Sequence, residues 1–501
     1  MTIMLRRILI ALCVAVSAFP AIAADNILRI GVGFLSFRGG QPYQGITLPS
    51  VTAHQAVYDY LTGVGENGIV EPALALSWTA ENPRSWVFKL RPGVSYSNDE
   101  PFNADAVVAS AEYMATTKGR AETIGSTLYQ VERAEKIDDL TVRVHLNEPD
   151  GLFPLHASAW RLPAPEAFKK QGNEGFQTHP VGTGPFVVTN WVTGHAIMKA
   201  NPKSWRKAKV AGLEIREIPE ETSRLQALAS GAIDIAQSLA ADQKSTLDEL
   251  GAKLVRRPTP NVSFLAAHTI PATSPLKDPR VRYALNLAVN RQYLIDQVMM
   301  GATTPASQLS FPGVFGYDPN LAPYPYDPEQ AKKLLAEAGY GQGLQLKVGI
   351  TAGTRASDTL YYQQIAADLQ RVGVTLELIA RPQQAQMQEM FYGKLTVDLF
   401  TMISRGNDAL ADYRHRTCSG LTQGRAAFHC DPKVMPALQA ALAEQDASKR
   451  LALYKEVARL ERDNPPGIIL WQSVEFDALA KGISGYAPVL EDLRLQLIEK
   501  K

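Results

Sequence analysis

The sequence has little cysteine, little net charge and no long hydrophobic run beyond its first residues. Three of its 501 residues are cysteine, and 51 basic side chains nearly balance 50 acidic ones. This balance predicts no basic surface of the kind that nucleic acids require. No segment after the N-terminus offers the roughly 18 uninterrupted apolar residues of a membrane-spanning helix. We therefore expect a soluble product that does not bind nucleic acid.

The sequence also lacks the local motifs of the common hydrolases and nucleotide-binding enzymes. Its eight histidines are scattered, and none lies in a His-Glu-x-x-His motif. Neither a Gly-x-Ser-x-Gly elbow nor a phosphate loop is present, and the glycines at 182–184 run directly into Pro185. We therefore predict a protein that is not an enzyme and needs no cofactor. The alternative is a secreted hydrolase whose triad only the fold assembles.

The first 23 residues have the layout of an export signal. Arg6 and Arg7 precede an apolar stretch at 8–16, and Ala-Ile-Ala at 21–23 forms a small-x-small cleavage site. Cleavage after Ala23 would leave 49 basic and 50 acidic side chains in a periplasmic protein. Cys13 lies inside the apolar stretch after a leucine, which is a poor context for a lipid anchor.

The two cysteines of the mature chain, Cys418 and Cys430, are separated by a polar, glycine-containing segment. In an oxidising compartment this favours a disulfide that closes a loop. The alternative is a metal site with His415 and His429, although zinc sites usually use closer cysteine pairs.

Strand and helix patterns alternate along the chain, which predicts an α/β fold. Residues 27–32 and 86–91 have strand patterns, and Asn103 can cap the helix after the second. The dipeptides Asp278-Pro279 and Asp327-Pro328 each predict a helix start.

A strand, a helix and a second strand follow in the C-terminal half of the chain. The strands are expected at 344–350 and 374–379, and the helix at 357–372. This order predicts a parallel βαβ unit. Because the mature chain is too long for one compact core, we expect two or three domains.

Six segments carry a resemblance to a known family. They are PALALSW at 72–78, WVFKLRPGV at 86–94, PFNADAVV at 101–108, VGTGPF at 181–186, DPRVRYALNLAVNR at 278–291 and YDPEQAKKLLAEAGY at 326–340. In this order and spacing the chain resembles the extracytoplasmic solute-binding proteins of the peptide/nickel/opine class, bacterial solute-binding protein family 5. These proteins are the receptors of bacterial ABC importers.

The resemblance implies a two-lobed periplasmic-binding-protein fold of type II, cluster C, with an extra domain inserted in the N-terminal lobe. We expect lobe I at 24–47, 181–262 and 466–501, the inserted domain at 48–180, and lobe II at 263–465. The implied function is capture of a peptide-like or opine-like polar solute by hinge closure. The implied partners are an inner-membrane permease and its cytoplasmic ATPase, and a monomer is expected.

Two loops after strands of lobe II are the predicted ligand site, since open α/β sheets bind ligands at the carboxyl ends of their strands. One loop carries Arg355, and the other carries Arg405, Asn407 and Asp408. A guanidinium can hold a carboxylate by two hydrogen bonds. The resemblance implies that Asp408 pairs with a ligand amine and Arg355 with its carboxylate. Asp412 is the alternative to Asp408 as the acid that pairs with the ligand amine. For Arg405 and Arg355 the alternative is a structural salt bridge within the protein.

The second loop departs from the peptide-binding members, which tend to have tryptophan and Asp-Pro there. The added arginine favours an anionic conjugate, such as an opine-like or sugar-phosphate-like solute, over a generic peptide. Phe37 and Arg38, after the first strand, are candidates to face the site from the other lobe. The alternative for Arg38 is an ordinary solvated position on the surface. Trp160 is a candidate wall of the ligand pocket, and its alternative is a position in the hydrophobic core.

Two other functions stay open at this point. Nickel-binding relatives use a histidine near the position of His415, which here lies between Arg414 and Arg416. Imidazole suits nickel, but the flanking arginines disfavour a cation unless a carboxylate-bearing chelator accompanies it. The alternative of a different class is a periplasmic, holdase-like chaperone.

Overall fold

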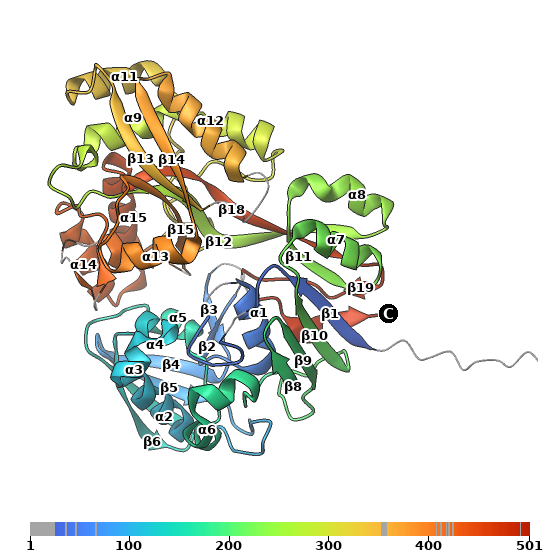
Figure 1. Cartoon of the computed structure of the whole chain (residues 1–501). Helices are drawn as coiled ribbons and strands as arrows, with labels where there is room; N and C mark the ends of the chain where they lie inside the picture. The colour runs from blue at the N-terminus through green and yellow to red at the C-terminus, as the bar shows by residue number, and fades with distance from the viewer. Residues whose placement is uncertain are drawn as a thin grey trace, which may run out of the picture.

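The computed structural model describes residues 26–35, 38–45, 48–65, 68–351, 358–406, 408–410, 413–416, 418, 421–422, 425–490 and 492–501. The predicted export signal, Phe37, Arg355, Asn407 and Asp412 therefore lie outside the described residues. The described chain forms two lobes (Figure 1). We call residues 263–465 the upper lobe and the remaining described residues the lower lobe.

One ten-stranded sheet runs through both lobes in the order β14-β13-β15-β12-β18-β11-β1-β10-β9-β8. Its strands are β1 (Ile27–Val32), β8 (Phe186–Val192), β9 (His195–Ala200), β10 (Gly212–Glu217), β11 (Ile235–Leu239), β12 (Lys253–Ala267), β13 (Leu344–Thr351), β14 (Val374–Arg381), β15 (Leu399–Arg405) and β18 (Gly467–Leu479). The long strands β12 and β18 pass from one lobe to the other and pair antiparallel (Figure 1). They are the connection on which the lobes can hinge.

The lower lobe adds a four-stranded antiparallel sheet in the order β4-β5-β7-β6. The strands of this sheet are β4 (Ala75–Asn82), β5 (Ser85–Leu90), β6 (Val131–Asp138) and β7 (Thr141–Leu146). The helices of the same segment are α2 (Ala104–Ala115), α3 (Thr117–Ala121), α4 (Thr123–Thr127), α5 (Phe153–His156) and α6 (Pro165–Thr178). Phe88 of this sheet and Leu28 of β1 belong to one continuous buried cluster. The segment expected as an inserted domain thus shares its core with lobe I.

The other lower-lobe elements surround the end of the ten-stranded sheet. They are α1 (Leu48–Val57), β2 (Thr62–Val64), β3 (Val70–Pro72), α7 (Glu221–Ala229), α8 (Lys244–Glu249), β19 (Ile483–Ser484) and β20 (Glu499–Lys500). Leucines of α7 and α8 pack against β11 in a separate small core. The C-terminal strands β19 and β20 also lie in the lower lobe, where the chain ends (Figure 1).

The upper lobe contains the predicted βαβ unit. Strands β13 and β14 pair in parallel, and α12 (Asp358–Gln370) connects them. The other elements are α9 (Pro279–Ala288), α10 (Arg291–Tyr293), α11 (Pro328–Glu337), α13 (Gln383–Phe391), α14 (Met435–Ala443), α15 (Ala447–Asp463), β16 (Leu421–Thr422) and β17 (Arg425–Ala426). Asp278 and Asp327 cap α9 and α11 as predicted, accepting hydrogen bonds from backbone amides within the first turn.

A buried ion pair lies where the two connecting strands enter the lower lobe. Arg257 of β12 donates through Nε to Asp477 Oδ2 of β18 at 2.6 Å, and both side chains are 0% exposed. Asp477 also accepts a hydrogen bond from the backbone amide of Ser238 and one from the hydroxyl of Tyr486. Just beyond this pair, between Pro258 and Val262, the register of β12 against β18 shifts. The ion pair therefore anchors the connecting strands immediately before an irregular segment.

Candidate ligand-binding cleft

Asp408, the predicted amine-binding acid, is almost fully buried on the upper lobe. It follows β15, and 2% of its side chain is exposed. Its Oδ1 accepts a hydrogen bond from the backbone amide of Leu410 at 2.8 Å and one from the hydroxyl of Tyr454 at 3.1 Å. Oδ1 of Asp408 is therefore held by its own lobe.

The other carboxylate oxygen of Asp408 meets the lower lobe. His156, the last residue of α5, approaches Asp408 Oδ2 with Nε2 at 3.1 Å and Asp150 Oδ2 with Nδ1 at 2.7 Å. Asp150 also accepts hydrogen bonds from Gln130 and from the backbone amide of Leu152. We call Asp150, His156, Asp408 and Tyr454 the lobe-bridging cluster.

The electrostatics of this cluster favour a charged imidazole. Burial disfavours the charged ring, but the charges and hydrogen bonds of Asp150 and Asp408 outweigh it and raise the pKa of His156 to about 10. Burial likewise opposes the charged form of Asp150, yet the neighbouring His156 lowers the pKa of that carboxyl. The cluster therefore joins the lobes by an ionic hydrogen bond.

Other contacts join the lobes near this cluster. The backbone amide of Gly151 donates to the carbonyl of Leu442 on α14 at 3.2 Å. The hydroxyls of Tyr129 and Tyr413 lie 3.4 Å apart. In Figure 1, α5 and α14 lie to the left of the place where β12 and β18 pass between the lobes. The lobes thus connect at one side and touch at the other, which describes a closed two-lobed protein.

The carboxyl ends of parallel strands from both lobes lie between these two sides. β1 and β11 pair in parallel up to Gly31 and Ala236, and Gln237 follows directly. Both side-chain amide atoms of Gln237 are buried without a hydrogen-bond partner among the described residues. On the upper lobe β15 ends at Arg405, which is paired in register with Asn261 of β12. Asn261 Oδ1 is also buried without a partner in the described part of the chain.

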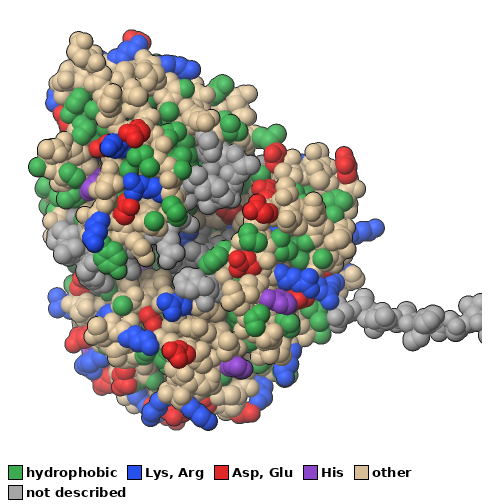
Figure 2. Space-filling model, viewed as in Figure 1, with side chains coloured by type: hydrophobic (Ala, Val, Ile, Leu, Met, Phe, Trp, Pro, Cys, Tyr) green, Lys and Arg blue, Asp and Glu red, His purple; other side chains and the backbone are tan. Residues whose placement is uncertain are grey.

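Figure 2 shows that the molecular surface is hollowed between the upper and lower lobes. This hollow is the candidate ligand cleft. Arg38 is exposed on the lower lobe, and Arg405 is half-buried on the upper lobe. Both have interactions within the protein.

Trp160 lies in the interior of the lower lobe. Its side chain is fully buried, its indole Nε1 donates to Ser110 Oγ at 2.8 Å, and its ring packs edge-on against Phe153. The structure therefore shows Trp160 as a core residue, which was the alternative to a pocket wall.

Sequence reasoning missed His156, Tyr454 and Gln237. His156 has no motif around it, because one of its carboxylate partners is 252 residues away in the chain. That the Gln237 amide has no partner among the described residues becomes visible only once its strand is placed in the sheet. Nothing in the sequence singles out these residues.

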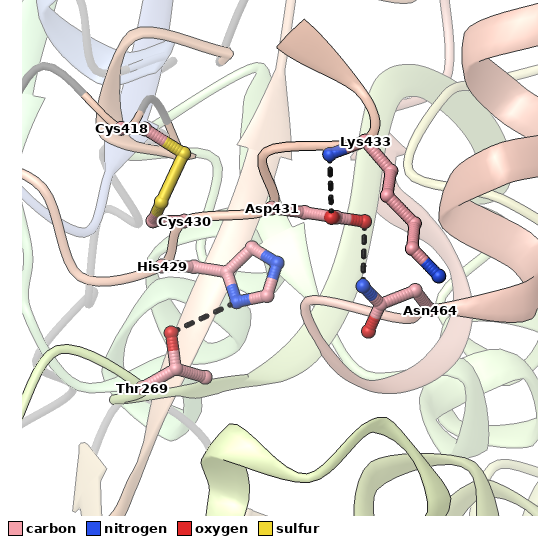
Figure 3. Close-up of a disulfide and its surroundings, with 7 residues drawn as sticks. All are labelled: Thr269, Cys418, His429, Cys430, Asp431, Lys433 and Asn464. Carbon is pink, nitrogen blue, oxygen red and sulfur yellow. Dashed lines mark hydrogen bonds between the residues drawn. A yellow bond between two sulfur atoms is a disulfide. The ribbon is translucent and has the colours of Figure 1, made fainter. Parts of the chain in front are cut away.

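The cysteine pair forms a disulfide near a buried histidine (Figure 3). Cys418 and Cys430 are joined, as the disulfide interpretation expected. His429 hydrogen-bonds through Nδ1 to Thr269, and burial lowers its pKa well below the ordinary value. The side chain of His415 lies outside the described part of the structure. Among the described residues no group of three histidine, cysteine or acidic side chains could hold a metal ion.

Two lobes joined by paired strands, with a hollow between them, define a solute receptor of the periplasmic-binding-protein type. The model of the family "Bacterial extracellular solute-binding proteins, family 5 Middle" matches residues 70–416. The chain belongs to this family and is a solute-binding component of an ABC importer. Among the described helices none is long and apolar enough to cross a membrane.

Relatives of known name align over most of the chain. It is 29% identical over 465 residues to heme-binding protein A of Haemophilus influenzae, covering 86% of this chain and 84% of that protein. It is 27% identical over 496 residues to the glutathione-binding protein GsiB of Salmonella typhimurium, with coverages of 95% and 94%. It is 28% identical over 454 residues to di/tripeptide-binding protein 2 of Pseudomonas aeruginosa, with coverages of 83% and 84%.

Solved structures share the fold at 22% sequence identity. The peptide-bound periplasmic protein DppA of Helicobacter pylori superposes with a TM-score of 0.81 over 95% of this chain and 98% of that one. AgaA of A. tumefaciens R10 in complex with agropinic acid gives 0.79 over 95% and 99%. NikZ of Campylobacter jejuni in complex with Ni(L-His) gives 0.80 over 95% and 100%.

Proposed function

We propose that this receptor captures a peptide-like or opine-like solute that bears a carboxylate. The observation that carries the proposal is the closed arrangement, with β12 and β18 at one side, the lobe-bridging cluster at the other, and strand ends of both lobes between them. A ligand drives such closure only by binding the closed state more tightly than the open one. Closure in turn presents a surface that a membrane permease can recognise.

The side chains at these strand ends support a ligand with both a carboxylate and amide groups. Arg405 ends β15, and we propose that it works with Arg355 and Arg38 on the ligand carboxylate. The buried amide of Gln237 can donate to a carbonyl and accept from an N–H group, and Asn261 Oδ1 can accept a second N–H. We include Phe37 and Asn407 as further ligand contacts. Relatives named for glutathione and for di- and tripeptides support this class of solute.

The setting of the receptor is part of the proposal. We propose export to the periplasm with cleavage after Ala23, action as a monomer, and delivery to an inner-membrane permease with its ATPase. We propose lobe boundaries near 180, 262 and 465, and no catalytic role. Nickel-chelate binding, which the NikZ likeness keeps as a second candidate, would use His415.

The test is calorimetric titration of the mature protein with tripeptides, glutathione, opines and nickel–histidine. We expect one of the carboxylate-bearing organic solutes to bind. Arg405→Ala and Gln237→Ala should each lower its affinity about tenfold or more by removing a ligand contact. Asp408→Ala should lower it by removing the contact with His156 that favours the closed form. Arg133→Ala is the matched control, since Arg133 pairs with Glu135 on an exposed strand of the lower lobe. Binding that requires nickel, or unchanged affinity in all three site variants, would contradict the proposal.

A further inference from the structure

The carboxylate of Asp408 has both oxygens engaged in the closed protein. Oδ1 accepts from the Leu410 amide and the Tyr454 hydroxyl, and Oδ2 accepts from His156. With 2% of the side chain exposed, neither oxygen is open to a further cation. A solute ammonium could reach Asp408 only by displacing His156.

The geometry of His156 requires two protons on its ring. Both ring nitrogens face carboxylate oxygens, of Asp150 at 2.7 Å and of Asp408 at 3.1 Å. A neutral imidazole has one N–H and could satisfy one of these acceptors, whereas the imidazolium donates to both. Because a carboxylate only accepts hydrogen bonds, the charged ring is the form that donates to both neighbours and completes the cluster.

The charges of the cluster balance without any ligand. Asp150 and Asp408 supply two negative charges, His156 supplies one positive charge, and the neighbouring guanidinium of Arg450 supplies the other. The guanidinium of Arg450 lies beside the cluster, where it donates to the carbonyl of Glu444 and acts electrostatically on Asp150 and Tyr454. A second buried cation would therefore lack a counter-charge, and burying an unpaired charge is costly.

We propose that His156 is a specificity-determining residue: in the closed receptor it occupies the Asp408 carboxylate in place of a ligand ammonium. The solutes selected are therefore carboxylate-bearing molecules whose nitrogen is acylated or otherwise uncharged at that end. This inference rests on the proposed capture of a peptide-like or opine-like solute. The protein supplies from its own lower lobe the cation that the amine of a free peptide would otherwise supply.

The first test compares trialanine with N-acetyl-trialanine by calorimetry. We expect the wild-type receptor to bind the acetylated peptide about tenfold more tightly or better, because the free amine meets no open carboxylate. His156→Ala exposes Asp408 and should reverse this preference. His145→Gln is the matched control, since His145 in the same lobe pairs at 3.1 Å with Glu135, which lies on the exposed edge strand β6. A wild-type preference for the free amine, or a preference unchanged in His156→Ala, overturns the proposal.

If neither peptide binds, that result counts against the proposed peptide-like ligand and not against the role of His156. A second measurement therefore tests the contact between His156 and Asp408 without any ligand. Imidazole ¹⁵N spectra of the mature protein, assigned with His156→Gln, report protonation of the His156 ring directly. We expect both ring nitrogens to be protonated at pH 8 and Asp408→Asn to lower the pKa of His156. A neutral ring at pH 8, or a pKa unaffected by Asp408→Asn, shows that His156 does not occupy Asp408 and overturns the inference.

Discussion

At the scale of single residues, His156 links the charge state of the protein to the contact between its lobes. Its ring lies between Asp150 and Asp408, with Tyr454 and Arg450 beside it. Burial, together with the charge of Asp408, raises the pKa of Tyr454 well above its ordinary value. Tyr454 therefore stays neutral over the pH range in which His156 loses its proton.

Stability should therefore depend on pH through His156. Its pKa rises from 6.5 in the unfolded chain to about 10 in the folded protein. The stabilisation is fully present below pH 6.5 and is lost as the pH rises through 10. We expect the unfolding free energy of the wild type to fall relative to that of His156→Gln between pH 7 and 10. Urea unfolding of both proteins across this range measures the difference, and parallel curves would contradict it.

The ion pair Arg257–Asp477 makes a second prediction at this scale. Asp477→Ala leaves a buried guanidinium without its counter-ion, which typically costs about 3–5 kcal/mol. Lys244→Ala, which breaks an exposed pair with Asp248 on α8, should cost about 0.5 kcal/mol or less. Chemical unfolding compares the two variants. Equal losses of unfolding free energy in the two variants would show that burial does not determine how much the Arg257–Asp477 pair stabilises the fold.

Residue roles could be predicted from sequence where the partners are close in the chain. Asp278 and Asp327 were predicted as helix caps, and both accept the expected backbone hydrogen bonds. Asp408 was selected as an acid at a strand end, but its engagement by His156 was not foreseen. Arg257 and Asp477 are 220 residues apart, so nothing local pairs them.

At the scale of elements, the disulfide constrains the segment between β15 and α14. Cys418 and Cys430 are 12 residues apart, and a loop of this length implies about 3 kcal/mol of stabilisation from restricting the unfolded chain. We expect the double variant Cys418→Ser/Cys430→Ser to unfold at a lower denaturant concentration than the wild type. Thiol titration of the mature wild-type protein, which lacks Cys13, under denaturing, non-reducing conditions should find no free thiol. Two free thiols, or equal midpoints, would contradict the prediction.

Elements with strong local patterns were predicted well. The βαβ unit of β13, α12 and β14 was expected within about two residues of each boundary, because apolar periodicity and capping are local signals. The course of β12 and β18 through both lobes was not expected, and β12 crosses the boundary predicted at 262. Pairing between strands so far apart in sequence depends on the assembled sheet.

At the scale of the whole molecule, the contacts of the lobe-bridging cluster should favour the closed form. His156→Ala removes the cation between Asp150 and Asp408, so like charges then face each other across the lobe contact. We expect the ligand-free variant to have a larger radius of gyration than the wild type in X-ray scattering. His145→Gln should scatter like the wild type, and identical profiles for all three proteins would argue against a closing role.

The class of protein, a solute-binding receptor, could be predicted from the sequence because six segments in fixed order carry the family resemblance. The relation of the inserted segment to lobe I was less accessible. Phe88 and Leu28 share one core, so the inserted segment and the β1 region of lobe I pack as one body.

The most direct test of the central claim is native mass spectrometry of the mature protein purified without denaturation. We expect one bound small molecule per protein monomer, released on unfolding, with a carboxylate and an amide and without a primary ammonium group. A bound nickel complex, a heterogeneous load of unfolded polypeptide, or a single solute that binds through a primary amine would contradict it.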